Sequence, residues 1–133
     1  MRDPRAEALR WLAAAREDLE YARHAAAGGH HAHACFHSQQ AAETSVKAVH
    51  YLRGARVVLG HTVRALIQSL NPRSEALDAL LDAARDLDLL YVPTRCPNGL
   101  DQGTPGEAFS GAHSSNAMAL ATRIAAAATG VVG

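Results

Sequence analysis

The sequence predicts an all-α fold, an up-and-down antiparallel helical bundle of four to five helices in which two long helices form a hairpin. Apolar residues make up 48% of the 133 residues but aromatic residues only 5%. The core must therefore be built mainly from Ala, Leu and Val, which suits close-packed helices better than a sheet. Apolar residues also recur at three- and four-residue spacing along the predicted helices. Residues 1–133 have the length of one domain, and we expect a single one.

The first helix is predicted to begin at Asp3-Pro4. The Asp side chain can cap free backbone N–H groups, and Pro fits the first helical position, where its missing N–H group costs nothing. The apolar stripe of this helix is Leu12, Ala15, Leu19, Ala22 and Ala26. Gly28-Gly29 is expected to end it.

A second helix is predicted from about His31 to Leu52, with Gly54 after it. Its inner face is expected to hold Cys35 or Phe36, Gln39, Ala42, Val46 and Val49. At about 1.5 Å per residue, each of these two helices is over about 30 Å long. The two-glycine turn between them leaves the pair little choice but to pack antiparallel as a helical hairpin.

The second half of the chain is predicted to hold shorter elements. An apolar connector at 55–60 leads to a short helix from His61 to Leu70, which Asn71-Pro72 ends. Ser74 is expected to cap a fourth helix, which keeps acidic residues such as Asp88 toward water.

That fourth helix is expected to stop before Pro93. Residues 92–110 are rich in Pro and Gly, so we expect a long loop without regular structure, of the kind that is usually functional or disordered. A last helix is predicted from about His113 to Ala128, with Ala117, Leu120, Ala121, Ile124 and Ala127 facing the bundle.

Charge and cysteine content limit the partners and the location. Lys plus Arg number 13 and Asp plus Glu number 13, so no overall basic field would draw the chain to DNA or to an anionic membrane. No apolar run near an end approaches the roughly 20 residues that a membrane span needs. The charged segment 1–5 lacks the apolar stretch of a signal peptide, and only Cys35 and Cys96 are present. We expect a cytoplasmic protein without membrane or DNA contacts.

A polar stripe in the middle of the second helix is the first group that could carry chemistry. Gln40, Glu43 and Lys47 follow at three- and four-residue spacing and share one face, with Phe36 a turn upstream. Lys47 is the one lysine of the chain. The alternative is a solvated face with a Glu-to-Lys pair at i, i+4, worth about 0.3–0.5 kcal/mol. Spacing alone favours that alternative.

The segment 91–97, with the sequence YVPTRCP, is the second such group. Two prolines flank Arg95 and stiffen the loop that presents it. The Arg is then pre-organised for phosphate, carboxylate or a helix C-terminus. A rigid loop whose Arg makes an internal salt bridge is the alternative, and the sequence leaves both open.

Histidines around the predicted turn between the long helices form the third group: His24, His30, His31, His33 and His37. A histidine pair at i, i+4 on a helix can hold zinc or nickel. The ligand set in this segment is incomplete, so we predict no metal site. Motifs for serine nucleophiles and phosphate-binding loops are absent, and no cofactor is expected.

The chain resembles a prokaryotic HEPN domain over nearly its whole length. The segments that carry the resemblance are 34–48, with the sequence ACFHSQQAAETSVKA, Gly60-His61 before a short helix, and 91–97. In similar domains the last of these often contains Arg-Tyr-Pro-Asp. Here Cys96 stands in place of the Tyr and Asn98 follows the Pro.

The resemblance implies an up-and-down bundle, usually a homodimer, found alone or beside a minimal nucleotidyltransferase in toxin–antitoxin pairs. It also implies nucleotide binding or, in many members, metal-independent ribonuclease activity through an Arg-x(4–6)-His motif. Arg56 with His61 and Arg23 with His30 match that spacing. Arg and His are frequent enough here for chance matches, and neither pair lies on the later helix where the motif belongs.

We therefore expect a HEPN-like binding or regulatory module that contacts a nucleotide, RNA or a partner nucleotidyltransferase. The alternative is a metal-independent ribonuclease, with Arg56 and His61 as the candidate catalytic residues. The candidate ligand-binding residues are Gln40, Glu43, Lys47, His61, Tyr91 and Arg95. Of these, Lys47, His61 and Arg95 are expected to form an anion site together with free N–H groups at the start of the third helix.

Self-association is expected as well. An Ala-rich bundle with the apolar connector Val57-Val58-Leu59 exposes more hydrophobic surface than one small domain can cover. Contiguous apolar patches usually mark interfaces. We therefore predict a symmetric homodimer.

Overall fold

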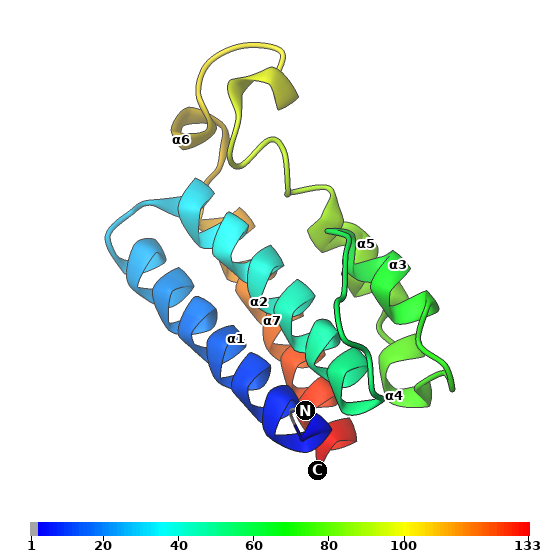
Figure 1. Cartoon of the computed structure of the whole chain (residues 1–133). Helices are drawn as coiled ribbons and strands as arrows, with labels where there is room; N and C mark the ends of the chain where they lie inside the picture. The colour runs from blue at the N-terminus through cyan, green and yellow to red at the C-terminus, as the bar shows by residue number, and fades with distance from the viewer. Residues whose placement is uncertain (1–2) are drawn as a thin grey trace.

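The computed structural model describes residues 3–133, and every regular element within them is helical. Three long helices form its body: α1 (Pro4–Ala27), α2 (His31–Leu52) and α7 (Gly111–Val132). Figure 1 shows α1 and α2 side by side as an antiparallel hairpin, with α7 packed against both. The predicted all-α bundle built on a long-helix hairpin is confirmed.

The hairpin forms where local signals predict it. The Asp3 side chain accepts a hydrogen bond from the Ala6 amide (3.2 Å) and so caps α1. At the turn, Gly29 has a φ of 81°, a left-handed conformation that glycine adopts without strain. The bounds of α2 agree with the prediction.

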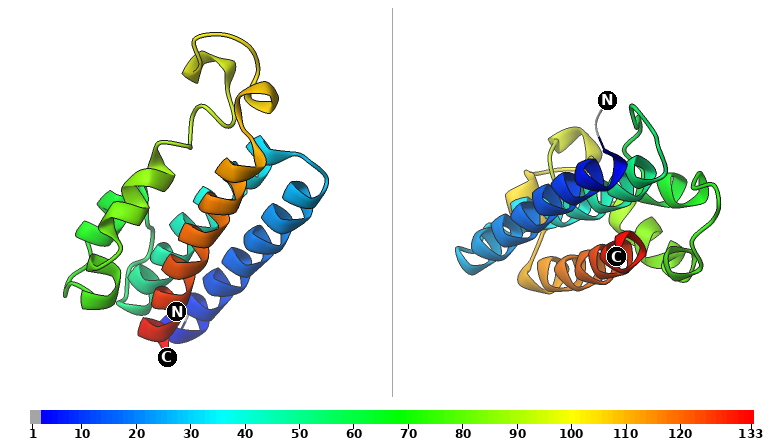
Figure 2. Two further views of the ribbon diagram at one scale, coloured as in Figure 1. Left: turned by 180° about the vertical axis from the view of Figure 1, so that it is seen from behind. Right: turned by 60° about the horizontal axis from the view of Figure 1, so that its bottom comes forward.

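The last helix is longer at both ends than predicted, because α7 begins at Gly111 and runs to Val132. It begins early because Ser110 and His113 form a reciprocal cap: the Ser110 amide donates to His113 Nδ1 at 2.9 Å. Its far end lies beside the start of α1, where Arg5 Nη1 donates to the Val132 carbonyl at 2.8 Å. Figure 2 shows the start of α1 and the end of α7 at this end of the bundle.

Three short helices, α3 (Val63–Gln68), α4 (Glu75–Asp78) and α5 (Leu81–Asp88), lie on the opposite side of α2 from α1 (Figure 1). The prediction of a single fourth helix is wrong. The segment forms two helices, α4 and α5, because the chain leaves helical geometry at Leu80 (φ −111°, ψ 17°). Ser74 does cap the first piece, as expected. No Gly or Pro marks the break, and the leucines on both sides of it, Leu77 and Leu87, are fully buried.

The loop at 92–110 contains more regular structure than predicted. It includes the 3-10 turn η1 (Pro97–Gly99) and the single-turn helix α6 (Pro105–Ala108). A capping box between Thr104 and Glu107 starts α6. In these turns, backbone N–H and C=O groups form hydrogen bonds within the segment. The segment therefore has a defined conformation although it lies outside the bundle. It lies over the end of the bundle where α1 turns into α2 (Figures 1 and 2).

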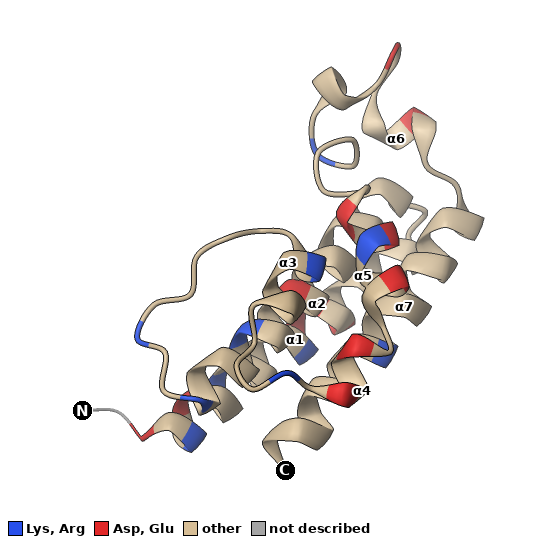
Figure 3. Cartoon of the chain, turned by 90° about the vertical axis from the view of Figure 1, so that its right-hand side faces the viewer, with Lys and Arg blue, Asp and Glu red and all other residues tan. Residues whose placement is uncertain are grey.

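The core is apolar and small-residue-rich, with alanines from α1, α2 and α7 and leucines from α3 to α5. None of the helices in residues 3–133 has the length and apolar character needed to cross a bilayer. Both cysteines are free thiols, Cys35 buried and Cys96 exposed. Charged side chains of both signs are spread over α3 to α5 (Figure 3), whereas Arg123 is the one charged residue in the sequence of α7.

Candidate functional site

The polar stripe in the middle of α2 is largely removed from solvent. Glu43 is 4% and Lys47 9% exposed, Gln40 is half-buried, and the adjacent Gln39 is 0% exposed. The solvated face that spacing alone favours is therefore wrong, although the i, i+4 pair itself is present: Lys47 Nζ lies 3.2 Å from Glu43 Oε2. Residues well apart in the sequence, on α3 and the segment before it, pack against this part of α2 and remove it from solvent.

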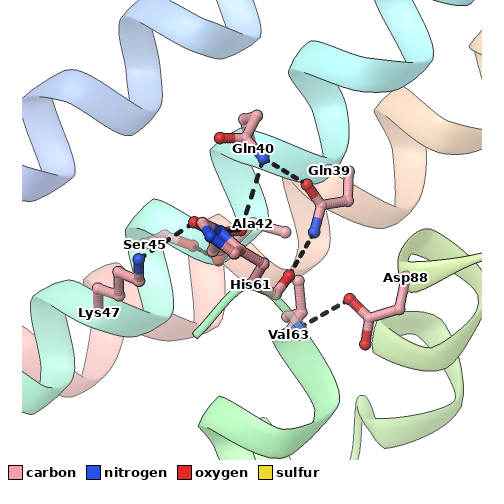
Figure 4. Close-up of polar contacts among 9 residues, drawn as sticks. Gln39, Gln40, Ala42, Ser45, Lys47, His61, Val63 and Asp88 are labelled. Atoms are coloured by element: carbon pink, nitrogen blue, oxygen red, sulfur yellow. Dashed lines mark hydrogen bonds and ion pairs between the residues drawn. The ribbon is translucent and has the colours of Figure 1, made fainter. Parts of the chain in front are cut away.

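Amide side chains connect this stripe to the segment that leads into α3 (Figure 4). Gln39 Nε2 donates to the His61 carbonyl at 2.9 Å. Gln40 Nε2 donates to Gln39 Oε1 at 2.7 Å and lies 3.5 Å from Glu43 Oε1. The result is a buried polar network that holds the backbone at His61 against the middle of α2.

His61 extends from this network to the surface. Its Nδ1 atom lies 3.5 Å from Glu43 Oε1, and its side chain is 63% exposed. A carboxylate in that position favours the tautomer that carries the ring hydrogen on Nδ1. The His61 ring is also stacked on Tyr91, with ring centroids 5.3 Å apart and an angle of 13°.

The stacking continues from Tyr91 to the loop. Tyr91 and Phe36 are stacked with centroids 6.1 Å apart, and Arg95 Cζ lies 5.1 Å from the centroid of the Phe36 ring. His61, Tyr91, Phe36 and Arg95 thus form one continuous series, which we call the aromatic row. The fold therefore brings together the predicted site residues from α2, from the start of α3 and from the 91–95 segment.

Arg95 is exposed, and no acidic side chain of residues 3–133 lies within salt-bridge distance of it. The alternative, an internal salt bridge made by Arg95, is therefore not found within residues 3–133. A cation–π contact of this kind is worth about 0.5–1 kcal/mol at an exposed site, enough to orient the guanidinium but not to neutralise it.

One element of the predicted anion site is absent. The third helix begins at Val63, two residues after His61, and its first amide groups are not free. Val63 N donates to Asp88 Oδ1 at 2.7 Å and Arg64 N to Asp88 Oδ2 at 3.0 Å. The carboxylate of Asp88 thus already occupies the helix start, where an anionic ligand was expected (Figure 4).

Two residues that sequence reasoning missed hold this site together, Gln39 and Asp88. A glutamine at an inner-face position of an apolar stripe is a recognisable signal, because a buried amide needs hydrogen-bond partners. Asp88 was expected to face water, since it lies among other acidic residues of the same helix. Its partners are 24 and 25 positions away, so no local pattern could have identified it.

The candidate nuclease residue Arg56 lies in the connector and is exposed. It makes no hydrogen bond or ion pair with any of residues 3–133, so nothing in the described chain orients it toward His61. The neighbouring Val57 and Leu59 are 70% and 83% exposed. The connector therefore presents two apolar side chains to solvent.

The histidines of the α1–α2 end are distributed among different partners. His31 Nδ1 lies 2.9 Å from Ser114 Oγ, and His37 Nδ1 lies 3.5 Å from Asp18 Oδ1. Burial raises the pKa of the Asp18 carboxyl, and the neighbouring His37 partly offsets that effect. Within residues 3–133 no three His, Cys, Asp or Glu side chains are arranged to hold a metal ion.

Comparisons with known proteins identify the family. The HEPN domain model matches residues 8–125. TT1696 from Thermus thermophilus is 34% identical, with 94% of this chain and 98% of that chain covered and a TM-score of 0.89. ST0689, an archaeal HEPN homologue, is 31% identical, with 96% and 98% covered and a TM-score of 0.79.

A HEPN domain protein from Thermotoga maritima is 32% identical, with 92% of this chain and 91% of that chain covered and a TM-score of 0.56. No curated protein matches the chain. The resemblance inferred from the sequence is thus confirmed, and because the family model covers most of the chain and solved HEPN proteins align with it over nearly their whole length, the chain belongs to the HEPN domain family.

Proposed function

We propose that this HEPN domain is a binding module for a nucleotide or a short stretch of RNA, and that the aromatic row is its contact surface. The observation that carries the proposal is the continuous stacking from His61 through Tyr91 and Phe36 to Arg95, at the surface beside a buried polar network. Aromatic rings next to an unpaired Arg suit a ligand that has both a base and a phosphate.

The predicted ligand-binding residues have two roles in this proposal. His61, Tyr91 and Arg95 contact the ligand, the rings through stacking and the guanidinium through charge-assisted hydrogen bonds to phosphate oxygens. Gln40, Glu43 and Lys47 position them instead. Lys47 is neutralised by Glu43 at 3.2 Å, so it offers little attraction to an anion.

Titration of a fluorescein-labelled single-stranded RNA oligonucleotide, and separately of AMP, tests the proposal at constant salt. Arg95→Gln and Tyr91→Ala are each expected to weaken binding about tenfold, the effect of one lost charge-assisted hydrogen bond or one lost stack. Arg123→Gln on α7 is the matched control, since it removes the same charge outside the row. Its affinity should equal that of the wild type.

Unchanged affinity in both Arg95→Gln and Tyr91→Ala would overturn the aromatic row as the contact surface. Melting temperatures of all variants distinguish a lost contact from a lost fold. If Arg95→Gln mainly lowers the melting temperature and leaves affinity intact, Arg95 has a structural role and the proposal fails for that residue.

We also propose that the module acts as a homodimer, with a nucleotidyltransferase as a candidate second partner. Support comes from Val57 and Leu59, which the connector exposes. Light scattering at micromolar concentration should give the mass of a dimer, and Leu59→Asp should shift it toward the monomer. Leu89→Asp is the control, because Leu89 is equally a leucine at the surface, 70% exposed, but lies outside the connector. A monomer mass for the wild-type protein would contradict the proposed homodimer.

Ribonuclease activity is the second candidate function. The observation in its favour is the Glu43 carboxylate beside Nδ1 of an exposed His61, an arrangement suited to a general base. The unsupported position of Arg56 argues against it, because stabilising the reacting phosphate needs a positioned cation. We expect no metal-independent RNA cleavage. Cleavage that is lost in both Arg56→Ala and His61→Ala, with folding intact, would make the protein a ribonuclease.

A further inference from the structure

A cavity that shares Phe36 and Arg95 with the aromatic row lies at the end of the bundle where α1 turns into α2. Its volume is about 550 Å³, and its walls come from the first turns of α2, from residues 94–95 and from the start of α6. These segments are brought together by the 89–110 region, which lies over this end of the bundle in Figure 1. A cavity of this size can hold a small organic ligand.

The polar side chains that line the cavity are His30, His31, His33, His37, Thr94 and Arg95, and no Asp or Glu lines it. Each of them can donate a hydrogen bond to a ligand. His33 and His37 are one turn apart on the same face of α2. Arg95 lines the same cavity and carries no acidic partner among residues 3–133. Convergent imidazoles and a guanidinium without a carboxylate suit an anion.

The Nδ1 atom of His37 lies on the side of α1. It is buried, has no hydrogen-bond partner among residues 3–133, and lies 3.5 Å from Asp18 Oδ1. The Tyr21 ring lies against the imidazole, with centroids 4.5 Å apart. Nε2 is therefore the nitrogen that remains for a ligand, because Nδ1 is buried, and it donates to a phosphate oxygen when the ring carries a hydrogen on both nitrogens. A carboxylate behind an imidazole fixes its ring and raises its capacity to interact with a ligand on the far side.

An apolar wall completes the cavity. Phe36 and Pro105 line it together with the polar groups. Arg95 lies over the Phe36 ring, so its guanidinium is held at the junction between the apolar wall and the histidines. A ligand that fills both parts carries a negative group at one end and a flat apolar group at the other.

We propose that this cavity binds an aromatic phosphate monoester, with the phosphate held by His33, His37 and Arg95 and the ring against Phe36. Asp18 acts as a positioning residue through His37. The site is independent of base stacking on the aromatic row, although Arg95 and Phe36 border both. Each phosphate oxygen can accept hydrogen bonds from these donors, and the dianion matches several donors better than a monoanionic carboxylate does.

Isothermal titration with phenyl phosphate tests the site in the wild-type protein. We expect a dissociation constant on the order of 0.1–1 mM, with inorganic phosphate about tenfold weaker and phenol without detectable binding. His33→Gln and Arg95→Gln are expected to weaken phenyl phosphate about fivefold to tenfold each. Amide shifts in NMR spectra should cluster at 31–37 and 94–95.

Two controls separate this cavity from the aromatic row and from general charge effects. His24→Gln and Arg123→Gln remove a histidine and an arginine outside the cavity lining and should bind as the wild type does. Tyr91→Ala, which disrupts the row, should change phenyl phosphate affinity by less than about twofold. If RNA does not bind, the phenyl phosphate prediction therefore still stands. If phenyl phosphate does not bind, the RNA prediction still stands.

Asp18→Asn distinguishes a positioning role from a general loss of stability, because affinity and melting temperature are measured on the same variant. If Asp18 orients His37, this variant should weaken phenyl phosphate about threefold while the melting temperature stays near that of the wild type. The proposal is overturned if phenyl phosphate binds His33→Gln and Arg95→Gln as tightly as the wild type, or if the NMR shifts cluster at His61 and Tyr91 instead.

Discussion

The middle of α2 and its N-terminal end both carry closely spaced polar side chains, but they differ in solvent access. In the middle, Gln39, Glu43 and Lys47 are buried by α3 and the segment before it. At the N-terminal end, His30 and His33 are exposed beside a cavity. On the side of α2 away from α1, the middle is covered by α3 and the segment before it, whereas the N-terminal end is faced by the 92–110 segment (Figure 1).

This difference separates side chains that hold the fold from side chains that are free for a ligand. A buried polar group without a partner costs about 1–3 kcal/mol, so the middle of α2 must pair each of its members. The observed network does so: Lys47 forms an ion pair with Glu43, and Gln39 donates a hydrogen bond to the His61 carbonyl. Exposed histidines are hydrated and need no protein partner. Polar side chains one or two turns apart on α2 therefore have different roles.

Glu43→Ala is expected to give the largest effect, because it leaves Lys47 buried without its carboxylate. Removing one partner of a buried ion pair costs about 3–5 kcal/mol. Urea unfolding followed by circular dichroism measures the free energy of unfolding. The double variant Glu43→Gln/Lys47→Met removes both charges at similar volume and should recover most of the loss. A loss below about 1 kcal/mol for Glu43→Ala would mean that the middle behaves as exposed surface does.

Cys35 lies between the two regions of α2 and gives a second test of burial. Burial raises the pKa of its thiol from 9.0 to about 11. The unfolded chain therefore releases this proton at a lower pH than the folded chain does. The stability from the buried thiol is complete below pH 9.0 and is lost as the pH rises to about 11. The expected loss is about 2–3 kcal/mol in total.

Comparison of wild type and Cys35→Ala isolates that contribution from every other effect of alkaline solution on the protein. Urea unfolding at about pH 8 and about pH 10.5 should show a steeper loss for the wild type than for the variant. Equal losses would show that Cys35 is accessible to water. Alkylation supplies a check at neutral pH, because the exposed Cys96 should react well before Cys35 does.

Asp88→Ala sharpens the comparison by testing what covers the middle of α2. The variant removes the carboxylate that accepts from the Val63 and Arg64 amides at the start of α3. Loss of such a cap costs about 1 kcal/mol, measured again by urea unfolding. Asp82→Ala on the same helix is the control, because its carboxylate is 92% exposed. Equal effects of the two would contradict a capping role for Asp88.

The smallest effect is expected at the N-terminal end of α2. His33 is exposed and makes no hydrogen bond within residues 3–133, so His33→Ala should change the free energy of unfolding by less than about 0.5 kcal/mol. Thermal unfolding monitored by circular dichroism is sufficient for this test. A loss comparable to that of Glu43→Ala would remove the distinction between the two regions.

Helix ends were predictable where the capping residue has a common pattern. Asp3 before Pro4 and Ser74 before an acidic turn both cap as expected. The start of α7 was missed because Ser110 is paired with His113, whereas the usual capping box has Glu or Gln at that position. The break at Leu80 was missed because it serves packing and has no glycine or proline to announce it.

The sequence by itself determined the helical class, the α1–α2 hairpin and the pairing of Glu43 with Lys47. Each follows from residues a few positions apart, through apolar periodicity, a two-glycine turn and i, i+4 spacing. Only the tertiary structure decided that this pair is buried, that Asp88 occupies the start of α3, and that His61 stacks on Tyr91. Those contacts join residues far apart in the chain, and their geometry depends on how whole helices pack.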